Sequence, residues 1–144
     1  MTTHNNNNIN NNNNNTFFFS TSSEQCLNTV HKDLNILAHE VLKISPIDFS
    51  ITCGYRSELY QKKLYNEGKS KTLNSKHTQC KAIDFVPYIN NKQDFTAIKE
   101  AYIITGLYIA KAKELDIKIR TGALWNYDNT KENKFEDVWH VELG

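Results

Sequence analysis

The chain has almost no excess charge and no long apolar run. Its 144 residues carry a formal net charge of +1 at pH 7. It therefore lacks the clustered positive charge by which a domain binds nucleic acid, and we expect no nucleic-acid partner. No apolar run approaches the length that a membrane-spanning helix requires. Phe17-Phe18-Phe19 is too short for the apolar core of a signal peptide, and no basic segment precedes it. We expect neither a membrane span nor a visible export signal.

Cysteine is also scarce. The three cysteines are Cys26, Cys53 and Cys80, an odd and small number. They cannot form the disulfide framework of a small secreted domain, and they fit a reducing compartment or simply buried thiols.

The composition that remains is that of one globular domain with a biased N-terminus. Hydrophobic residues make up 39% and charged residues 23% of the chain, an ordinary balance. Residues 5–8 and 10–15 are asparagine, and such a tract cannot bury apolar surface. We expect residues 1–20 to be a disordered Asn-rich tail and residues 21–144 to be a single folded domain that is a monomer.

Helical and strand patterns alternate along the domain. Ser22-x-x-Gln25 resembles a capping box, and apolar residues at three- and four-residue steps then predict one amphipathic helix through Val41. Further helices are predicted over 57–64 and from Asp94 through Ala112. Strands are predicted over 49–53, 82–86 (ended by Pro87), 117–120 and 138–143. This arrangement predicts an α+β fold with a small, mainly antiparallel sheet flanked by helices.

Two histidines and a carboxylate stand out as candidate metal ligands. His77 and Asp84 are seven residues apart, and His140 lies far along the chain, so the sheet would have to bring the three together. Three protein ligands with one open position are typical of a catalytic zinc site. Asp137 precedes His140 by three residues and could act as a general base. The alternative is that both histidines are ordinary, partly buried imidazoles and that Asp84 caps a loop.

The pattern S-x-H-x(6)-D over Ser75–Asp84, followed by D-x-x-H over Asp137–His140, resembles a known enzyme family. This is the family of zinc D-Ala-D-Ala carboxypeptidases, VanY-like enzymes and phage L-alanyl-D-glutamate endopeptidases. The resemblance implies the hedgehog/DD-peptidase-like fold and peptidoglycan stem peptides as substrates. It also implies one zinc ion per chain, held by His77, Asp84 and His140, and it implies Asp137 as the general base.

Other residues resemble the same family. Gly54-Tyr55-Arg56 matches a G-x-R at a strand end, which implies that Arg56 binds the substrate and stabilises the charged transition state. The resemblance also implies that Ser75 orients its loop or binds the substrate peptide. Gln61 and the segment 68–71 resemble family members without implying a role here. Cys80 departs from the family, which usually has glycine at that place. A small buried residue is the favoured interpretation, although a soft thiolate ligand is the alternative.

Three functions remain open at this stage. An L-alanyl-D-glutamate endopeptidase is favoured, because Asp33-Leu34, residues 45–49 and residues 138–143 resemble phage-type members and because the base is an aspartate. The alternatives are a D-Ala-D-Ala carboxypeptidase and a non-catalytic, zinc-containing binding module on the same fold. We expect the protein to stay in the cytoplasm until it is released, or to reach the cell wall by a route that the sequence does not show.

Overall fold

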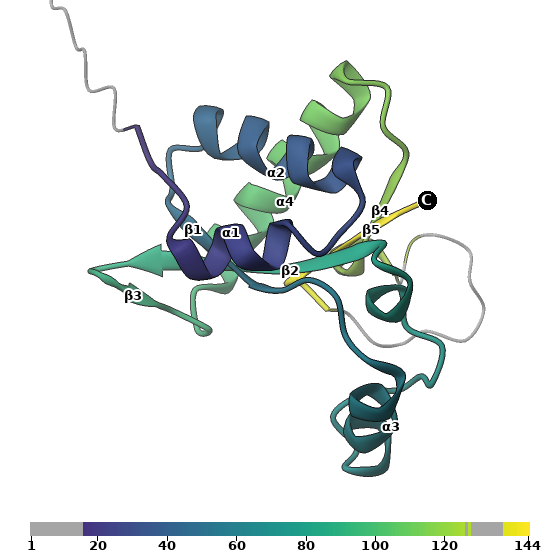
Figure 1. The fold of residues 1–144 in the computed structure, drawn as a ribbon. Coiled ribbons are helices and arrows are strands. Elements are labelled where there is room, and N and C mark those ends of the chain that lie inside the picture. The colour runs from purple at the N-terminus through teal and green to yellow at the C-terminus, as the bar shows by residue number, and fades with distance from the viewer. Residues whose placement is uncertain (1–15, 126, 128–136) are drawn as a thin grey trace, which may run out of the picture.

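An antiparallel sheet in the order β1-β2-β5-β4 forms the centre of the fold (Figure 1). This computed structural model describes residues 16–125, 127 and 137–144. The strands are β1 (Phe49–Cys53), β2 (Ala82–Ile89), β4 (Ile119–Thr121) and β5 (His140–Leu143), and a short β3 (Lys92–Gln93) pairs with β2. The helices are α1 (Thr21–Leu27), α2 (Lys32–Ile44), α3 (Glu58–Asn66) and α4 (Ile98–Glu114), with short 3-10 turns η1 (Lys76–Gln79) and η2 (Gly122–Leu124). The predicted α+β class with a small antiparallel sheet is confirmed.

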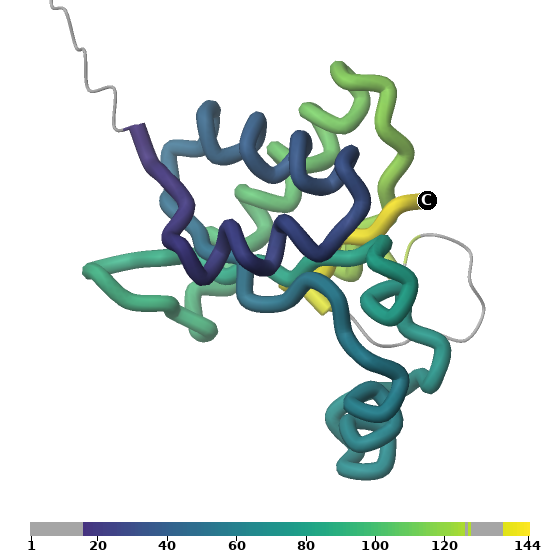
Figure 2. The backbone as a smooth tube through the Cα atoms, viewed as in Figure 1, coloured from purple at the N-terminus to yellow at the C-terminus, as the bar shows by residue number. Residues whose placement is uncertain are grey.

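The helices fall into two groups around the sheet. Helix α4 packs on β2 and β4, α2 packs on α4, and α1 packs on β1. Figures 1 and 2 show α2 and α4 together on one side, while α3 stands out at the other end of the molecule. No helix among the described residues is both long and apolar enough to cross a membrane.

Aromatic side chains fill the centre of the core. The ring centroids of Phe49 and Phe85 lie 5.8 Å apart, and Tyr108 of α4 stacks on Phe85 at 5.4 Å. Ile83 and Phe85 of β2 and Val141 of β5 are fully buried on the same side. Because side chains alternate across a strand, Asp84, His140 and Glu142 lie on the opposite face of the sheet. The candidate site therefore lies across the sheet from the core.

The first predicted helix is two helices. The N-cap of α1 is Ser20, whose side chain accepts a hydrogen bond from the Ser23 amide at 3.2 Å, so the capping box at Ser22 was wrong. The chain breaks after Leu27, and His31 caps α2 by accepting a hydrogen bond from the Asp33 amide. Apolar periodicity continued through the break because both helices present leucines to one core.

Two predicted element ends were also wrong. Strand β2 continues through Pro87, which lies opposite Phe49, while the next residue, Tyr88, donates its amide hydrogen to Asp48. Only alternate residues of an antiparallel strand donate to a given neighbour, so the missing N–H of Pro87 interrupts no bond to β1. Asp94 does not cap α4. Its carboxylate accepts hydrogen bonds from Thr96 in the preceding turn, and α4 starts at Ile98.

The packed part of the chain begins before residue 21. Phe17 and Phe19 are partly buried against the core. The ring of Phe19 makes edge contacts with His39 at 5.1 Å and with Phe49 at 5.5 Å. The segment 17–19 thus belongs structurally to the domain, contrary to the predicted tail boundary. The asparagine tract up to residue 15 lies outside the described residues.

Candidate metal centre and cleft

Three neighbouring strands place polar side chains in one row across the exposed side of the sheet. Asp84 of β2 pairs with His140 of β5 and with Cys53 of β1 in the register of the sheet. His77 comes from η1, just before β2, and is 2% exposed. The Ser75 hydroxyl caps η1 by accepting the amide hydrogen of His77 at 3.2 Å. Sheet register and this cap bring the predicted ligands together.

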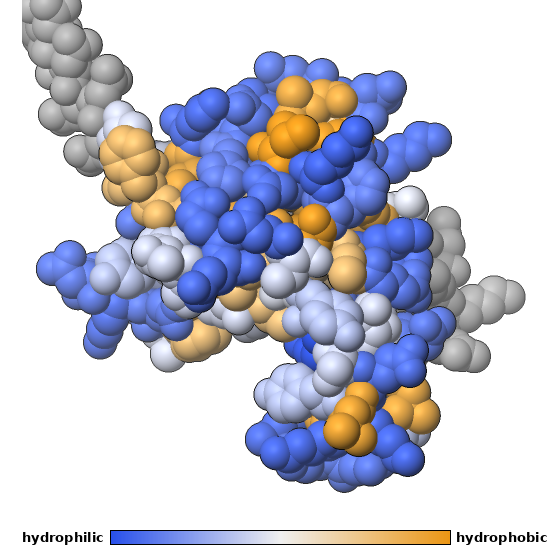
Figure 3. Space-filling model, in the orientation of Figure 1, coloured by the Kyte–Doolittle hydropathy of each residue, from blue (hydrophilic) through white to orange (hydrophobic). Residues whose placement is uncertain are grey.

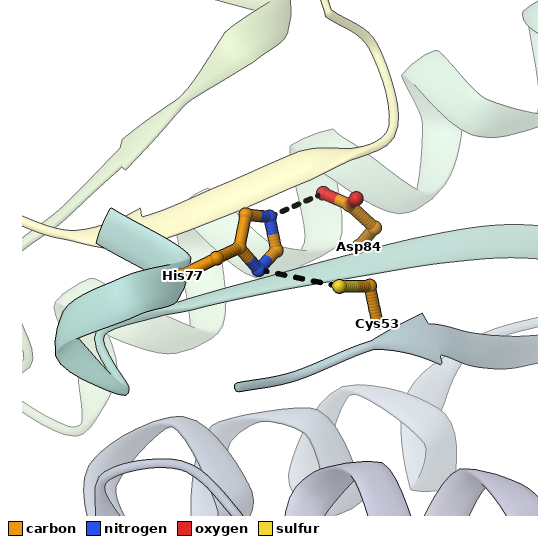
Figure 4. Close-up of side chains that lie close together, drawn as sticks. All are labelled: Cys53, His77 and Asp84. Atoms are coloured by element: carbon orange, nitrogen blue, oxygen red, sulfur yellow. Dashed lines mark hydrogen bonds and ion pairs between the residues drawn. The ribbon is translucent and has the colours of Figure 1, made fainter. Parts of the chain in front are cut away.

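The three predicted metal ligands converge on one carboxylate oxygen. His77 Nε2 lies 3.1 Å and His140 Nδ1 lies 3.2 Å from the same atom, Asp84 Oδ1. The two imidazole rings stand edge to face with their centroids 5.0 Å apart. Figure 4 shows His77 lying between Asp84 on one side and Cys53 on the other. Two imidazole nitrogens beside one carboxylate oxygen are donor types that suit zinc.

The second nitrogen of each ring is held by another acceptor. His77 Nδ1 lies 2.8 Å from the carbonyl oxygen of Gly54, and His140 Nε2 lies 3.0 Å from Glu142 Oε1. Each acceptor favours a proton on the nitrogen it faces, so that once the ring is neutral its other nitrogen offers the lone pair to a cation. Metal-binding histidines characteristically have such partners on their second nitrogen. Glu142, a buried carboxylate, therefore orients His140.

Without a cation, the cluster retains protons. Burial favours neutral His77, but hydrogen bonds with Asp84 and Cys53 outweigh it and raise the pKa of His77 to about 10. For His140, burial is likewise outweighed by Asp84 and Glu142, so its pKa is also raised. Burial would raise the pKa of Asp84, yet the two histidines hold it well below its usual range. A bound cation would take the place of the imidazolium protons beside this carboxylate.

Cys53 adds a second, overlapping group of potential ligands with His77 and Asp84. Its sulfur lies 3.6 Å from His77 Nδ1, the nitrogen that already bonds the Gly54 carbonyl at 2.8 Å. Sulfur and Asp84 thus face different nitrogens of one ring, and the His77–Asp84–His140 set has the better-directed donors. Burial would raise the pKa of the Cys53 thiol, but the hydrogen bond to His77 outweighs it and the pKa is lowered. The sequence prediction did not include Cys53, whose only signal is its place directly before Gly54-Tyr55-Arg56.

Asp137 joins the centre from the chain leading into β5. Asp84, Asp137 and His140 offer ligand atoms that all lie within 4.8 Å of one another. The Asp137 amide donates to the Gly122 carbonyl at 3.1 Å, and a Cβ at Gly122 would collide with the Asp137 backbone. Glycine at 122 is thus required for this close approach. Burial, and then the negative charge of Asp84, raise the pKa of Asp137.

Arg56 reaches the same site from the end of β1. Its Nη1 donates to Gln61 Oε1 at 2.8 Å, and its Nη2 lies 3.5 Å from Cys53 Sγ and 3.7 Å from Asp84 Oδ2. Its Nε is buried with no hydrogen-bond partner among the described residues.

These groups surround a cleft of about 190 Å³. All six residues predicted for the site line it, together with a basic and polar loop on one side and an indole on the other. Among the described residues the lining is Arg56, Leu64, Lys69, Ser70, Lys71, Thr72, Ser75, His77, Asp84, Trp125, Asp137 and His140. Trp125, which sequence reasoning left out of the site, lies with its ring centroid 5.1 Å from that of His140.

Comparisons with known proteins point to one family of peptidases. A model of the phage L-alanyl-D-glutamate peptidase family matches residues 15–144. The L-alanyl-D-glutamate peptidase of Escherichia phage T5 is 36% identical over 130 residues, which cover 85% of this chain and 94% of that protein. The crystal structure of the Serratia marcescens L-Ala D-Glu endopeptidase ChiX superposes with a TM-score of 0.78 at 26% identity, and the match covers 92% of this chain and 94% of that one.

Proposed function

Because the chain belongs to the phage L-alanyl-D-glutamate peptidase family, we propose that it is a zinc-dependent endopeptidase. Its reaction would be hydrolysis of the bond between L-alanine and D-glutamate in peptidoglycan stem peptides. The observation that carries the proposal is the convergence of His77 Nε2 and His140 Nδ1 on Asp84 Oδ1, with Asp137 beside them in the cleft. We further infer one zinc ion per chain, a monomer, and action on the cell wall.

The donor set determines what the cation would contribute. His77, Asp84 and His140 would hold a zinc ion, which would supply Lewis-acid chemistry to the scissile carbonyl and to a water molecule. The chain's own residues must then hold the peptide, move a proton and keep the ligands in place.

Asp137 is the residue suited to moving the proton. Among the described residues of the cleft, it is the one carboxylate that neither imidazole engages, since Asp84 is hydrogen-bonded to both rings. Its raised pKa makes it a stronger base than an exposed aspartate, and proton transfer is most effective when the base is matched to the working pH. Asp137 would accept the proton of the attacking water and deliver it to the leaving amine of D-glutamate.

Arg56 is suited to binding the negative charge. Its guanidinium is permanently charged, forked and lines the cleft. With Lys69 and Lys71 on the neighbouring loop, it makes one side of the cleft cationic. Stem peptides carry free carboxylates, and the tetrahedral intermediate carries a developing oxyanion. Ser75, whose hydroxyl caps η1, supports this side by fixing the backbone at His77.

The test is digestion of purified peptidoglycan followed by mass spectrometry of the fragments. New D-glutamate amino termini are expected from the zinc-loaded protein, with Asp137→Asn as the matched control that retains the fold and the ligands. Release of free D-alanine alone would favour the carboxypeptidase alternative. Absence of any product, with zinc bound and the fold intact, would favour the non-catalytic binding module.

A further inference from the structure

The one side chain that helix α3 buries completely is polar. Gln61 is the only buried residue of the helix and is fully buried. Leu59, by contrast, is 81% exposed, and Figure 3 shows apolar surface on the outward side of the part of the molecule that α3 occupies. A fully buried amide must have its hydrogen bonds satisfied, so its contacts determine why this residue is present.

The Gln61 amide joins two walls of the cleft. Its Oε1 accepts from Arg56 Nη1 at 2.8 Å, and its Nε2 donates to Ser70 Oγ at 2.8 Å and to the Thr72 carbonyl at 2.7 Å. Arginine can only donate and a carbonyl can only accept, so only one orientation of the amide satisfies all three contacts. Arg56, Ser70 and Thr72 all line the cleft beside His77 and Asp84.

We propose that Gln61 is a positioning residue for peptide hydrolysis. It acts by holding the Arg56 guanidinium at a fixed place relative to residues 70–72, which line the cleft. The inference rests on the proposed function. The other contacts of the Arg56 guanidinium are longer, at 3.5 Å to Cys53 Sγ and 3.7 Å to Asp84 Oδ2. Without Gln61, attraction would draw the guanidinium toward Asp84, where it competes with the cation for the carboxylate and leaves the substrate.

Two substitutions separate the two halves of this contact. Gln61→Glu retains an acceptor for Arg56 but places a carboxylate oxygen against the Thr72 carbonyl, so it weakens only the contact with residues 70–72. Gln61→Leu removes both contacts. We expect Gln61→Leu to lower kcat by between about ten- and a hundredfold, the scale of a misplaced catalytic group. Gln61→Glu should mainly raise KM. Lys62→Met, at the next and exposed position of α3, is the matched control and should change neither.

A double-mutant cycle decides whether Gln61 acts through Arg56. In an Arg56→Ala background, Gln61→Leu should cost less than about threefold in kcat, because the group that it positions is gone. An equal loss in both backgrounds would overturn the proposal and indicate a merely structural role. Zinc content and circular dichroism of each variant show whether the protein remains folded and loaded.

A second measurement does not depend on activity. In the nitrogen-15 NMR spectrum of the zinc-loaded wild-type protein, the Arg56 guanidinium should give resolved, slowly exchanging N–H signals, because Nη1 is held by Gln61. In Gln61→Leu these signals should broaden or average, and in Gln61→Glu they should persist. Identical Arg56 signals in wild type and Gln61→Leu would overturn the proposal. If the wild type released no peptidoglycan fragment, the proposed function would fail while these spectra still decided the role of Gln61.

Discussion

Glu142 provides the most direct test of the metal centre, because it touches a proposed ligand without facing the cleft. Its carboxylate is 5% exposed and bonds His140 Nε2 at 3.0 Å, on the opposite side of the ring from Asp84. Glu142→Gln retains an acceptor atom but loses the charge that favours a proton on Nε2. Glu142→Ala removes the acceptor and leaves a buried N–H without a partner.

The expected losses follow from these contacts. Removing the partner of a metal-binding histidine typically costs between about 10- and 100-fold in affinity. Glu142→Gln should lie near the lower figure, about 1.4 kcal/mol, and Glu142→Ala near the higher one, about 2.7 kcal/mol. Competition with a chromophoric chelator measures the zinc affinity directly. Glu114→Gln, which removes a carboxylate from the exposed end of α4, is the matched control and should have the wild-type affinity.

The same variants separate orientation from catalysis. Glu142 is a second carboxylate beside His140, but it is engaged with that ring and does not line the cleft. At saturating zinc, kcat of Glu142→Gln should therefore stay within about threefold of wild type, unlike the loss expected for a general base. Wild-type zinc affinity combined with a lost kcat would refute the reasoning and make Glu142 the base.

Four further outcomes follow from the structure. Asp137→Asn should retain zinc and lose about a hundredfold or more in kcat. The activity of the wild-type protein should fall as pH drops through the raised pKa of Asp137, because the base must be deprotonated. Zinc affinity should also weaken as pH falls, by about tenfold per pH unit for each proton displaced, because the metal-free protein holds a proton on His77 with a pKa of about 10. Calorimetric titrations in buffers of different ionisation enthalpy would count the protons that zinc binding releases. Cys80→Gly should stabilise the fold by about 1 kcal/mol in denaturant unfolding, because Cys80 has φ of 58°, whereas Cys80→Ala should give no gain. Phe19→Ala should cost about 1–2 kcal/mol, whereas deletion of residues 1–15 should leave the melting temperature unchanged.

The sequence was sufficient to predict that the proposed ligands lie close together, and the sheet explains why. His77 and Asp84 are separated by one 3-10 turn and the start of β2, so their spacing alone nearly fixes their distance. His140 is brought beside Asp84 by the antiparallel pairing of β2 with β5. Glu142 could have been found by the same reasoning, since a residue two positions along a strand shares the face of His140.

Long-range contacts were beyond that reasoning. Nothing in the local pattern of Gln61 distinguishes it from the exposed residues on either side, because its partners are nine and eleven residues away in an irregular loop. The docking of Phe19 on Phe49 likewise depends on a strand thirty residues later. The asparagine content of residues 5–15 carries no information about where the packed part of the chain begins.

Cys53 shows how one irregularity changes the chemistry of a strand. Strict alternation from Phe49 and Ile51, both buried in the core, would place Cys53 in the core as well. The register of β1 on β2 instead shifts between Ile51 and Cys53, so that Cys53 lies opposite Asp84 and its sulfur reaches His77. A one-residue slip exchanges the faces of a strand, and a bulge does this locally without disturbing the residues before it. The backbone at Gly54, the next residue, approaches the Cys26 carbonyl too closely for a side chain, and the shift turns Cys53, the last residue of β1, toward the candidate metal centre.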